Sequence, residues 1–473
     1  MNKQPDWRSE VEEPKIVDQA DYIISELGKG RDGKVIKVVP FDGGIGYMYA
    51  EGEILVRDEY LEQVLVILEH PRSVRELQEA DPGPLVQPVI EGITLLTSLG
   101  DHYPEVIGTP ERPGALDVID QRLGDGVATP NQVMTVAGGH GTPCPATEPE
   151  EVYDGIEPFP SVCHGNGGEG VLIYIADTGL LREAEPAADP GWMTDHRWLA
   201  GVKVEKTPED LDPHNPLTGS PPKIPAYTGH GTFVAGVARC MAPAAEVIVT
   251  NECKKAGSTL ESDLVPRLRA AIGLGVDIFH LAVAAPSRKD LPYIAVEKWL
   301  QLLREHTSSV CVSPAGNSGV RRLTWPGAFP DVVAVGALGG DWRGRASFSN
   351  HGGWVDVYTP GRDLINAYAT GRYKCHWAPY KNDERNFYGM AKWSGTSFSS
   401  PIMTGLIAAR MSSTGENGRQ AAAALLAEAR ARTIPGVGPV LLPCCGRADS
   451  CHCCRGADPR PCCQGAAHQP CCR

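Results

Sequence analysis

The stretch VLIYIADTGL (171–180) begins with six uncharged residues, which Asp177, Thr178 and Gly179 follow. A strand with one wet face alternates apolar and polar side chains, whereas a strand buried on both faces of a parallel sheet is apolar throughout. Similar apolar runs recur at 246–250, 277–283, 308–313 and 332–337. Segments of helical length and spacing, 259–275 and 292–306, lie between them. We therefore expect a doubly wound α/β region with a parallel sheet, in which ligands bind beyond the carboxyl ends of the strands.

The rest of the chain divides around this region by composition. Residues 1–33 are polar and are expected to form a leader. Residues 34–136 alternate strand-like and helix-like pieces, which predicts a small α/β or α+β N-terminal domain. Residues 137–160 begin with a Gly- and Pro-rich stretch and are interpreted as a linker.

Residues 436–473 contain nine of the 15 cysteines, in a repeat with a step of nine residues. A repeat this short with almost no apolar residues cannot bury a core, so we expect a tail. The simplest interpretation is a low-complexity extension, or even an out-of-frame translated repeat. Metal binding is the alternative, because Cys451, His452 and His468 add ligands to the paired thiols.

The charge of the chain narrows the classes of partner. A formal net charge of -14 and a pI near 5.4 argue against nucleic acid or an anionic membrane, because both would repel the protein. The first residues contain no apolar segment typical of a secretory signal, and no run of 18 apolar residues predicts a membrane span. The cysteines outside the tail are scattered, which fits a reducing compartment. We expect a cytoplasmic protein.

Two polar residues stand where chemistry is expected in such a fold. Asp177 follows the first apolar run, at the rim where α/β sites form, although aspartate is also a common turn residue there. His230 lies in TGHGTFVAGVA (228–238), at the start of an expected helix. The glycines on both sides of it leave room for a substrate backbone. The motif GHGT also occurs at 139–142. Prolines follow His140 and prevent a helix, so we interpret His140 as structural.

The serine-rich stretch WSGTSFSSPIMTG (393–405) supplies a candidate nucleophile. Its apolar residues have helical spacing, and Pro401 is tolerable only in the first turn, which places Ser397 at a helix N-terminus. A plain N-cap serine is the commoner role at such a position, but unpaired backbone N–H groups also gather there. SPAGNSG (313–319) follows another buried strand and places Asn317 where its amide can donate to a developing oxyanion, together with the Ser397 N–H.

These side chains form a set that catalysis requires. A serine hydroxyl is a poor nucleophile until a positioned base takes its proton, and that base needs an acidic partner to fix its tautomer. The chain supplies Asp177, His230 and Ser397 in this order, which is the subtilisin order among convergent Ser-His-Asp enzymes. An esterase of the α/β-hydrolase type would require G-x-S-x-G and the order Ser, acid, His, and the chain shows neither.

Residues from about 165 to 430 resemble a subtilisin-like serine protease, a subtilase. The resemblance is carried by IADTGL, GHGTFVAGVA, SPAGNSG and SGTSFSSPIMTG, in this order. It implies a subtilisin-like three-layer fold with a parallel sheet for residues 161–435, and a serine endopeptidase that works through an acyl-enzyme. In that enzyme Asp177, His230 and Ser397 form the triad. Asn317 stabilises the oxyanion.

The resemblance also implies how a substrate is held. The segments HLAVAAPS (280–287) and SPAGN (313–317) would wall the P1 pocket and pair with an extended chain. The residues assigned to substrate binding are Ala282, Val283, Ala284, Ala315 and Gly316. The family usually has Ser and Gly where this chain has alanines in HLAVAAPS, so pairing there is expected to differ. These alanines favour the alternative of a catalytically inactive, subtilase-derived binding or scaffold protein.

Expectations about partners follow from the same resemblance. Subtilases are commonly made with an inhibitory prodomain, so residues 34–136 are expected to be prodomain-like or regulatory and to inhibit intramolecularly; a partner-binding domain is the alternative. We expect a polypeptide substrate and no required cofactor. An acidic cluster before His230 would favour basic substrates or hold structural calcium, although a solvated loop is the simpler expectation. Its members are Glu205, Glu209, Asp210 and Asp212.

Overall fold

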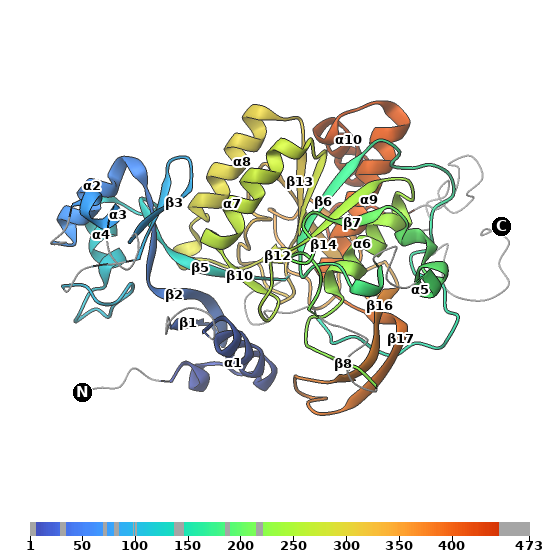
Figure 1. The fold of residues 1–473 in the computed structure, drawn as a ribbon, viewed down its shortest axis with the longest axis horizontal. Coiled ribbons are helices and arrows are strands. Elements are labelled where there is room, and N and C mark those ends of the chain that lie inside the picture. The colour runs from blue at the N-terminus through green and yellow to red at the C-terminus, as the bar shows by residue number, and fades with distance from the viewer. Residues whose placement is uncertain are drawn as a thin grey trace.

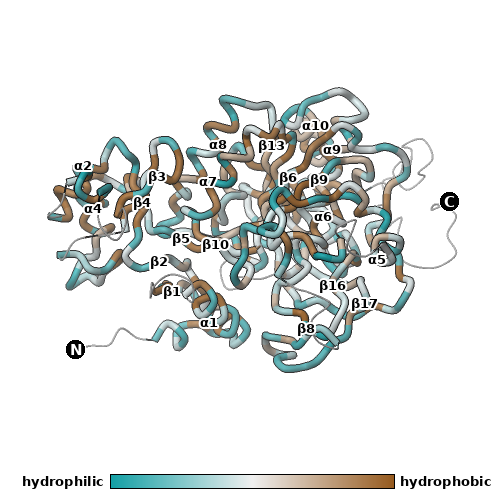
Figure 2. Tube along the Cα trace, in the orientation of Figure 1, coloured by the Kyte–Doolittle hydropathy of each residue, from teal (hydrophilic) through white to brown (hydrophobic). Residues whose placement is uncertain are grey.

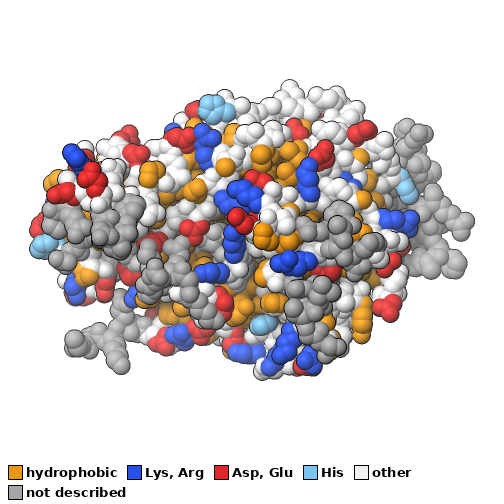
Figure 3. Space-filling view, in the orientation of Figure 1, with side chains coloured by type: hydrophobic (Ala, Val, Ile, Leu, Met, Phe, Trp, Pro, Cys, Tyr) orange, Lys and Arg blue, Asp and Glu red, His pale blue; other side chains and the backbone are white. Residues whose placement is uncertain are grey.

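The structure is a computed structural model. It describes residues 6–28, 35–69, 73–79, 85–97, 99, 102–136, 146–184, 190–213 and 221–443. The histidine at 140 and the cysteine-rich repeat from Cys444, with its candidate ligands Cys451, His452 and His468, lie outside these residues. Among the residues described, no helix is long and apolar enough to cross a membrane. Figure 3 shows acidic and basic side chains interspersed on one face of the molecule, so the net negative charge is not gathered into one patch there.

A parallel sheet forms the centre of the region after residue 146 (Figure 1). Its strands run in the order β15-β14-β13-β11-β6-β9-β7, and every neighbouring pair is parallel. The strands are β6 (Leu172–Asp177), β7 (Val202–Val204), β9 (Glu246–Asn251), β11 (Ile278–Leu281), β13 (Val310–Pro314), β14 (Val332–Leu338) and β15 (Val357–Pro360). The apolar runs thus form this sheet, and the prediction of a parallel α/β fold is confirmed.

Helices cover both faces of the sheet, which explains why β6 is apolar throughout. Ile173 and Ile175 belong to a core cluster with α6, α9 and α10, whereas Tyr174 and Ala176 belong to a second cluster with α7 and α8. Burying each such side chain contributes about 1.5–3 kcal/mol. Figure 2 shows hydrophobic residues gathered along these central strands. The helices are α5 (Pro190–Asp195), α6 (His230–Met241), α7 (Glu261–Ala271), α8 (Ile294–His306), α9 (Thr396–Thr414) and α10 (Gly418–Ala431).

A second, antiparallel sheet is built from the N-terminal region and lies beside α7 and α8 (Figure 1). Its own elements are β1 (Ile36–Phe41), β2 (Gly44–Arg57), α2 (Leu61–Ile67), α3 (Val74–Gln78), β3 (Val86–Ile90), β4 (Ile93–Leu96), α4 (Ala115–Leu123) and β5 (Ala128–Val136). Two short strands from the later region join it through β5. These are β10 (Ser258–Leu260) and β12 (Val283–Ala284). The N-terminal region is therefore bonded edge to edge with the body of the protein.

The segment expected to be a polar leader contains a packed helix, α1 (Pro14–Gly28). Its buried apolar residues, Ile16, Ala20, Ile23 and Leu27, recur at steps of four, three and four, which places them on one face of a helix. That face packs against strands of the N-terminal sheet and against Leu260 of β10. The overall polarity of the segment concealed this spacing.

An antiparallel hairpin extends from the body just before the serine-rich motif (Figure 1). It consists of β16 (Leu364–Lys374) and β17 (Glu384–Trp393), and β8 (Lys223–Ile224) pairs with β16 on the side away from β17. Part of the predicted linker is tied to this hairpin, because Glu150 pairs with Lys392 and Phe159 with Ile365. Residues 137–145 of that linker lie outside the described residues.

Candidate active site

Asp177 is the last residue of β6, at the carboxyl edge of the central sheet. Its backbone carbonyl accepts hydrogen bonds from the N–H groups of Glu252 and Cys253, each at 2.9 Å. Its Oδ1 accepts the N–H of Thr178 at 2.6 Å. The backbone of Asp177 is therefore held by the two residues that follow the neighbouring strand β9, and its fully buried carboxylate by the N–H of the next residue.

His230 is the first residue of α6, and its ring meets Asp177. The distance from His230 Nδ1 to Asp177 Oδ1 is 2.7 Å, with both side chains fully buried. The glycine after the histidine has a different role from the one expected. A Cβ on Gly231 would lie 2.5 Å from the carbonyl oxygen of Gly179, so this glycine lets the chain that follows Asp177 pass close beneath α6. It makes room for the protein's own backbone at this position.

Ser397 lies in the first turn of α9, as the motif predicts. The ring of the next residue, Phe398, lies 5.2 Å from the ring of His230, measured between centroids, so the start of α9 adjoins the histidine. Among the described residues, neither Ser397 Oγ nor His230 Nε2 has a hydrogen-bond partner. The structure therefore brings the serine to the histidine's side of the sheet without joining the two by a hydrogen bond.

The other serines of the motif have local contacts. Ser394 Oγ accepts the N–H of Asp363 at 2.9 Å, and Ser400 Oγ lies 3.5 Å from Nε2 of His280. Ser399 is fully buried, and its Oγ, like that of Ser397, has no hydrogen-bond partner among the described residues. Ser397 is the second residue of α9 and is followed by Phe398, whose ring adjoins that of His230.

Asn317 is connected to the turn that presents Ser397. Its Oδ1 accepts hydrogen bonds from Thr396 N at 2.8 Å and Thr396 Oγ1 at 2.9 Å, and that hydroxyl in turn accepts the N–H of Gly316 at 3.1 Å. These bonds engage the carbonyl end of the amide, so Nδ2 is the end that can donate to an oxyanion. Sequence reasoning did not anticipate the threonine, whose only signal was its place before the serine.

The expected substrate-binding residues fall into two groups. Val283 and Ala284 form β12, where Val283 pairs with Val136 and Ala284 with Thr135 of β5; Ala282 precedes them and donates its N–H to Ala176. Ala315 and Gly316 follow β13 at the carboxyl edge of the sheet. The first group is therefore paired with a strand of the same chain.

A second strand that pairs with β5 was missed by sequence reasoning. β10 pairs with the other edge of β5, and the N–H of Val136 donates to the carbonyl of Gly257 at 2.8 Å. β5 thus runs antiparallel between β10 and β12. The segment of β10 is short and partly polar, so nothing in its pattern distinguished it from a turn before α7.

His280 is a buried titratable group beneath the candidate nucleophile. It lies in β11, and its Nδ1 is 2.9 Å from the hydroxyl of Thr404 on α9. Burial lowers the pKa of His280 to about 4, with the proximity of His230 adding to the effect and that of Asp177 opposing it. The neutral ring therefore connects the central sheet to the helix that carries Ser397.

This buried histidine predicts a loss of stability in acid. The ordinary pKa of histidine is 6.5, so between pH 6.5 and about pH 4 the imidazole of His280 binds a proton in the unfolded chain but not in the native chain. The free energy of unfolding therefore falls as the pH drops from about 6.5 to about 4. We expect His280→Asn to flatten this dependence in urea unfolding at pH 7 and pH 4.5. His306→Asn, an exposed position at the end of α8, is the control. An unchanged slope in His280→Asn would contradict the assignment.

The acidic cluster is a solvated loop only in part, because Glu209 is exposed and Glu205 is half-buried. Asp210 and Asp212 are fully buried. Asp210 Oδ1 accepts the N–H of Asn251 at 2.9 Å and lies 2.7 Å from Arg267 Nη2. Within the part of the chain that the structure describes, no group of three or more His, Cys, Asp or Glu side chains is placed to hold a metal ion. The backbone and arginine partners explain why these carboxylates are buried.

Known proteins are similar to this chain in the region that contains the parallel sheet. A family model described as the subtilase family matches residues 168–437, more than half of the 473 residues. A thermophilic serine proteinase of Bacillus sp. (strain AK1) is 31% identical over 273 residues, which are 58% of this chain and 59% of that protein. An intracellular serine protease of Paenibacillus polymyxa is 27% identical over 276 residues, which are 54% of this chain and 72% of that protein.

Solved structures show a more distant likeness. A cold adapted subtilisin-like serine proteinase is 20% identical, with a TM-score of 0.43, and the match covers 59% of this chain and 90% of that chain. The chain spans about 59% of the length of the Bacillus proteinase. The extent of the family match, together with the parallel sheet and the ordered motifs at its carboxyl edge, shows that this chain belongs to the subtilase family.

Proposed function

We propose that the chain is a serine endopeptidase in which Asp177, His230 and Ser397 act as a catalytic triad. The observation that carries this proposal is the 2.7 Å contact between His230 Nδ1 and Asp177 Oδ1, beside the first turn of α9. An Nδ1–H that donates to the carboxylate leaves Nε2 as the basic nitrogen, which is the tautomer that can take a proton from serine. Family membership supports the same reaction class.

In this mechanism Ser397 Oγ attacks the carbonyl carbon of the scissile peptide bond while His230 Nε2 takes its proton. The carbonyl oxygen becomes an oxyanion, which accepts hydrogen bonds from Asn317 Nδ2 and from the backbone N–H of Ser397. His230 then returns the proton to the leaving amine, and an acyl-enzyme remains on Ser397. Water, deprotonated by the same nitrogen, releases the acid and restores the serine.

The proposed substrate is an extended polypeptide that adds a strand to the groove between β10 and β12. β5 shows how such a chain is held, because backbone pairing on both edges gives affinity without regard to sequence. The side chains of Met134 and Val136 are fully buried in the core of the body, so apolar residues at these two positions are favoured. The side chains named here supply every proton transfer in the scheme, so the reaction is proposed to need no cofactor.

We further propose that the N-terminal region inhibits this site in the intact chain. β5 occupies the groove where a substrate strand would pair, and the three triad side chains are fully buried. Helix α1 adds a contact at the rim. Its Tyr22 lies 6.3 Å from the ring of Tyr227 and 5.7 Å from that of Trp377, measured between centroids. The N-terminal region therefore covers the groove as well as filling it.

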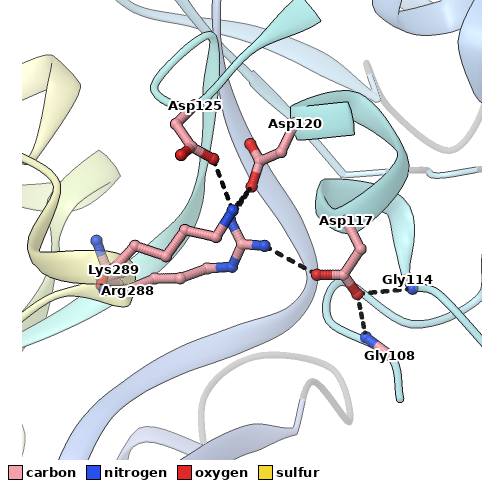
Figure 4. A network of polar contacts seen from close by, with 8 residues as sticks. Gly108, Gly114, Asp117, Asp120, Asp125, Arg288 and Lys289 are labelled. Carbon is pink, nitrogen blue, oxygen red and sulfur yellow. Dashed lines mark hydrogen bonds and ion pairs between the residues drawn. The ribbon is translucent and has the colours of Figure 1, made fainter. Parts of the chain in front are cut away.

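A cluster of ion pairs holds the N-terminal sheet to the body (Figure 4). Arg288, just after β12, reaches Asp117 and Asp120 on α4, and Lys289 reaches Asp120 and Asp125. The side chain of Arg288 is 7% exposed, so water screens these contacts little. Further ion pairs cross the same boundary: Arg57 with Glu297, Arg269 with Glu91, and Lys381 with Asp18.

The cluster is expected to persist as the pH falls. Burial acts to raise the pKa of Asp117, but the N–H groups of Gly108 and Gly114 and the charge of Arg288 outweigh it and hold this pKa below its ordinary value. A carboxylate with a lowered native pKa stabilises the folded form at all pH values above its ordinary pKa and loses the effect only as the pH falls through the lowered one. Mild acid is therefore not expected to release the N-terminal region.

The proposed activity is tested by labelling with a fluorophosphonate probe followed by mass spectrometry of the peptides. We expect one adduct, on Ser397, and its loss in His230→Ala, because the serine then has no base. The experiment is done on the intact chain and on Arg288→Glu, in which the inhibitory region is loosened. A folded protein that is labelled in neither form would favour the inactive scaffold, which the arrangement of the four reactive side chains does not otherwise support.

A further inference from the structure

A carboxylate outside the triad is attached to the backbone beside His230. Asp212 is fully buried, and its Oδ2 accepts the N–H of Gly229 at 2.9 Å. Gly229 is the N-cap of α6 and immediately precedes the histidine. This bond therefore fixes the backbone of the residue that immediately precedes His230.

The same loop is attached to the strand that presents Asp177. Asp212 N donates to the carbonyl of Leu180 at 2.8 Å, and Leu180 N donates to the carbonyl of Asp210 at 3.0 Å. A Cβ on Gly179 would lie 2.7 Å from that Asp210 oxygen, so the two segments run in close contact. Asp212 thus connects the chain just after Asp177 with the chain just before His230.

Gly229 has little freedom to find another position. Its φ of +77° is in the left-handed region, and a Cβ there would lie 3.0 Å from the ring of Tyr368. An anionic acceptor at the N-terminus of α6 also complements the positive end of the helix. Without Asp212 the N–H of Gly229 would be left buried and unpaired, and the turn would shift to satisfy it.

We propose that Asp212 is a positioning residue, which holds the turn at Gly229 and through it keeps the imidazole of His230 in register with Asp177. This inference rests on the proposed proteolytic function. Asp212 accepts a backbone N–H and takes no part in proton transfer. Its action is on the geometry of the base, so the chemical step depends on it and substrate binding does not.

The experiment compares Asp212→Ala with Asp212→Asn in full-length protein that also carries Arg288→Glu, which loosens the inhibitory region, on a peptide anilide of sequence Met-Thr-Val-Ala taken from residues 134–137. We expect Asp212→Ala to lower kcat by about 10- to 100-fold, since a displacement near 1 Å in a catalytic group has effects of that size, with KM nearly unchanged. Asp212→Asn keeps an oxygen acceptor for Gly229 and is expected to restore most of kcat.

Asp277→Ala is the matched control. Asp277 Oδ2 accepts the N–H of Leu172 at 2.9 Å, so the variant removes the same kind of bond at the opposite end of β6. It should lower the melting temperature and leave kcat unchanged. The proposal is overturned if Asp212→Ala keeps full kcat, if Asp212→Asn fails to restore it, or if Asp277→Ala loses as much. A folded Arg288→Glu parent that neither hydrolyses the anilide nor is labelled by the fluorophosphonate probe would instead overturn the proposed function.

Discussion

Replacing Ser397 with alanine is expected to abolish peptide hydrolysis. Removing the nucleophile of a subtilisin lowers kcat by about 10⁶-fold, and the same order of loss is expected here because no other serine of the motif stands in its place. The hydroxyl makes no hydrogen bond within the described residues, so its removal leaves no partner unsatisfied, and stability should stay within about 0.5–1 kcal/mol of the original. The measurement is the rate of hydrolysis of the Met-Thr-Val-Ala anilide in the Arg288→Glu background, where the inhibitory region is loosened, with the melting temperature beside it.

Ser399→Ala is the control for this prediction. Ser399 is also fully buried in the first turns of α9, but it is two residues further along the helix, and its hydroxyl lies against Gly361, where an added Cβ would be 2.0 Å from Oγ. Its variant should keep hydrolysis near the original rate. Comparable losses in both variants would mean that the packing of the helix, rather than the Ser397 hydroxyl, is what the reaction requires.

Reversing the charge of Arg288 is expected to activate the intact chain. Arg288→Glu leaves Asp117 and Asp120 facing a third carboxylate at a boundary that is nearly closed to water, and breaking a buried ion pair costs about 3–5 kcal/mol. A change of this size makes opening of the N-terminal region about 10²- to 4 × 10³-fold more frequent. Hydrolysis by intact protein, with gel analysis to show that the chain remains uncut, measures it.

Arg304→Glu provides the comparison for this second prediction. Arg304 pairs with Asp331 at 3.0 Å, but the pair is exposed and lies wholly within the body. Its variant should behave as the original chain does. If Arg288→Glu shows no more hydrolysis than the original while Ser397 is reactive toward the probe, the N-terminal region does not restrain the site in the way proposed.

The fold was predictable from the sequence where burial on two faces left no alternative. The apolar run ending at Asp177 can be accommodated only inside a covered sheet, and its neighbours along the chain repeat that pattern. Helix α1 was not anticipated, because an apolar residue every third or fourth position is diluted by the charges between them. The mean polarity of this short segment therefore gave less information than the spacing of its apolar residues.

The candidate site was predictable in its residue types but less so in its supports. Ser397 and His230 stand at helix starts that glycine, proline and apolar spacing indicate. The pairing of β5 with β10 joins segments more than 100 residues apart and has no local signature. Asp212 lies in an acidic stretch whose composition suggests solvent exposure. Contacts of this kind depend on where distant segments meet, which spacing within one segment does not reveal.

The convergence of the reactive groups is tested most directly by a crystal structure of the protein after phosphonylation by a small fluorophosphonate. The adduct imitates the tetrahedral intermediate on the serine. We expect it on Ser397 Oγ, with its phosphoryl oxygen within about 3.1 Å of Asn317 Nδ2 and of the Ser397 N–H, and with His230 still bonded to Asp177. An adduct on another residue, or one on Ser397 whose oxygen points away from Asn317 and His230, would contradict the account.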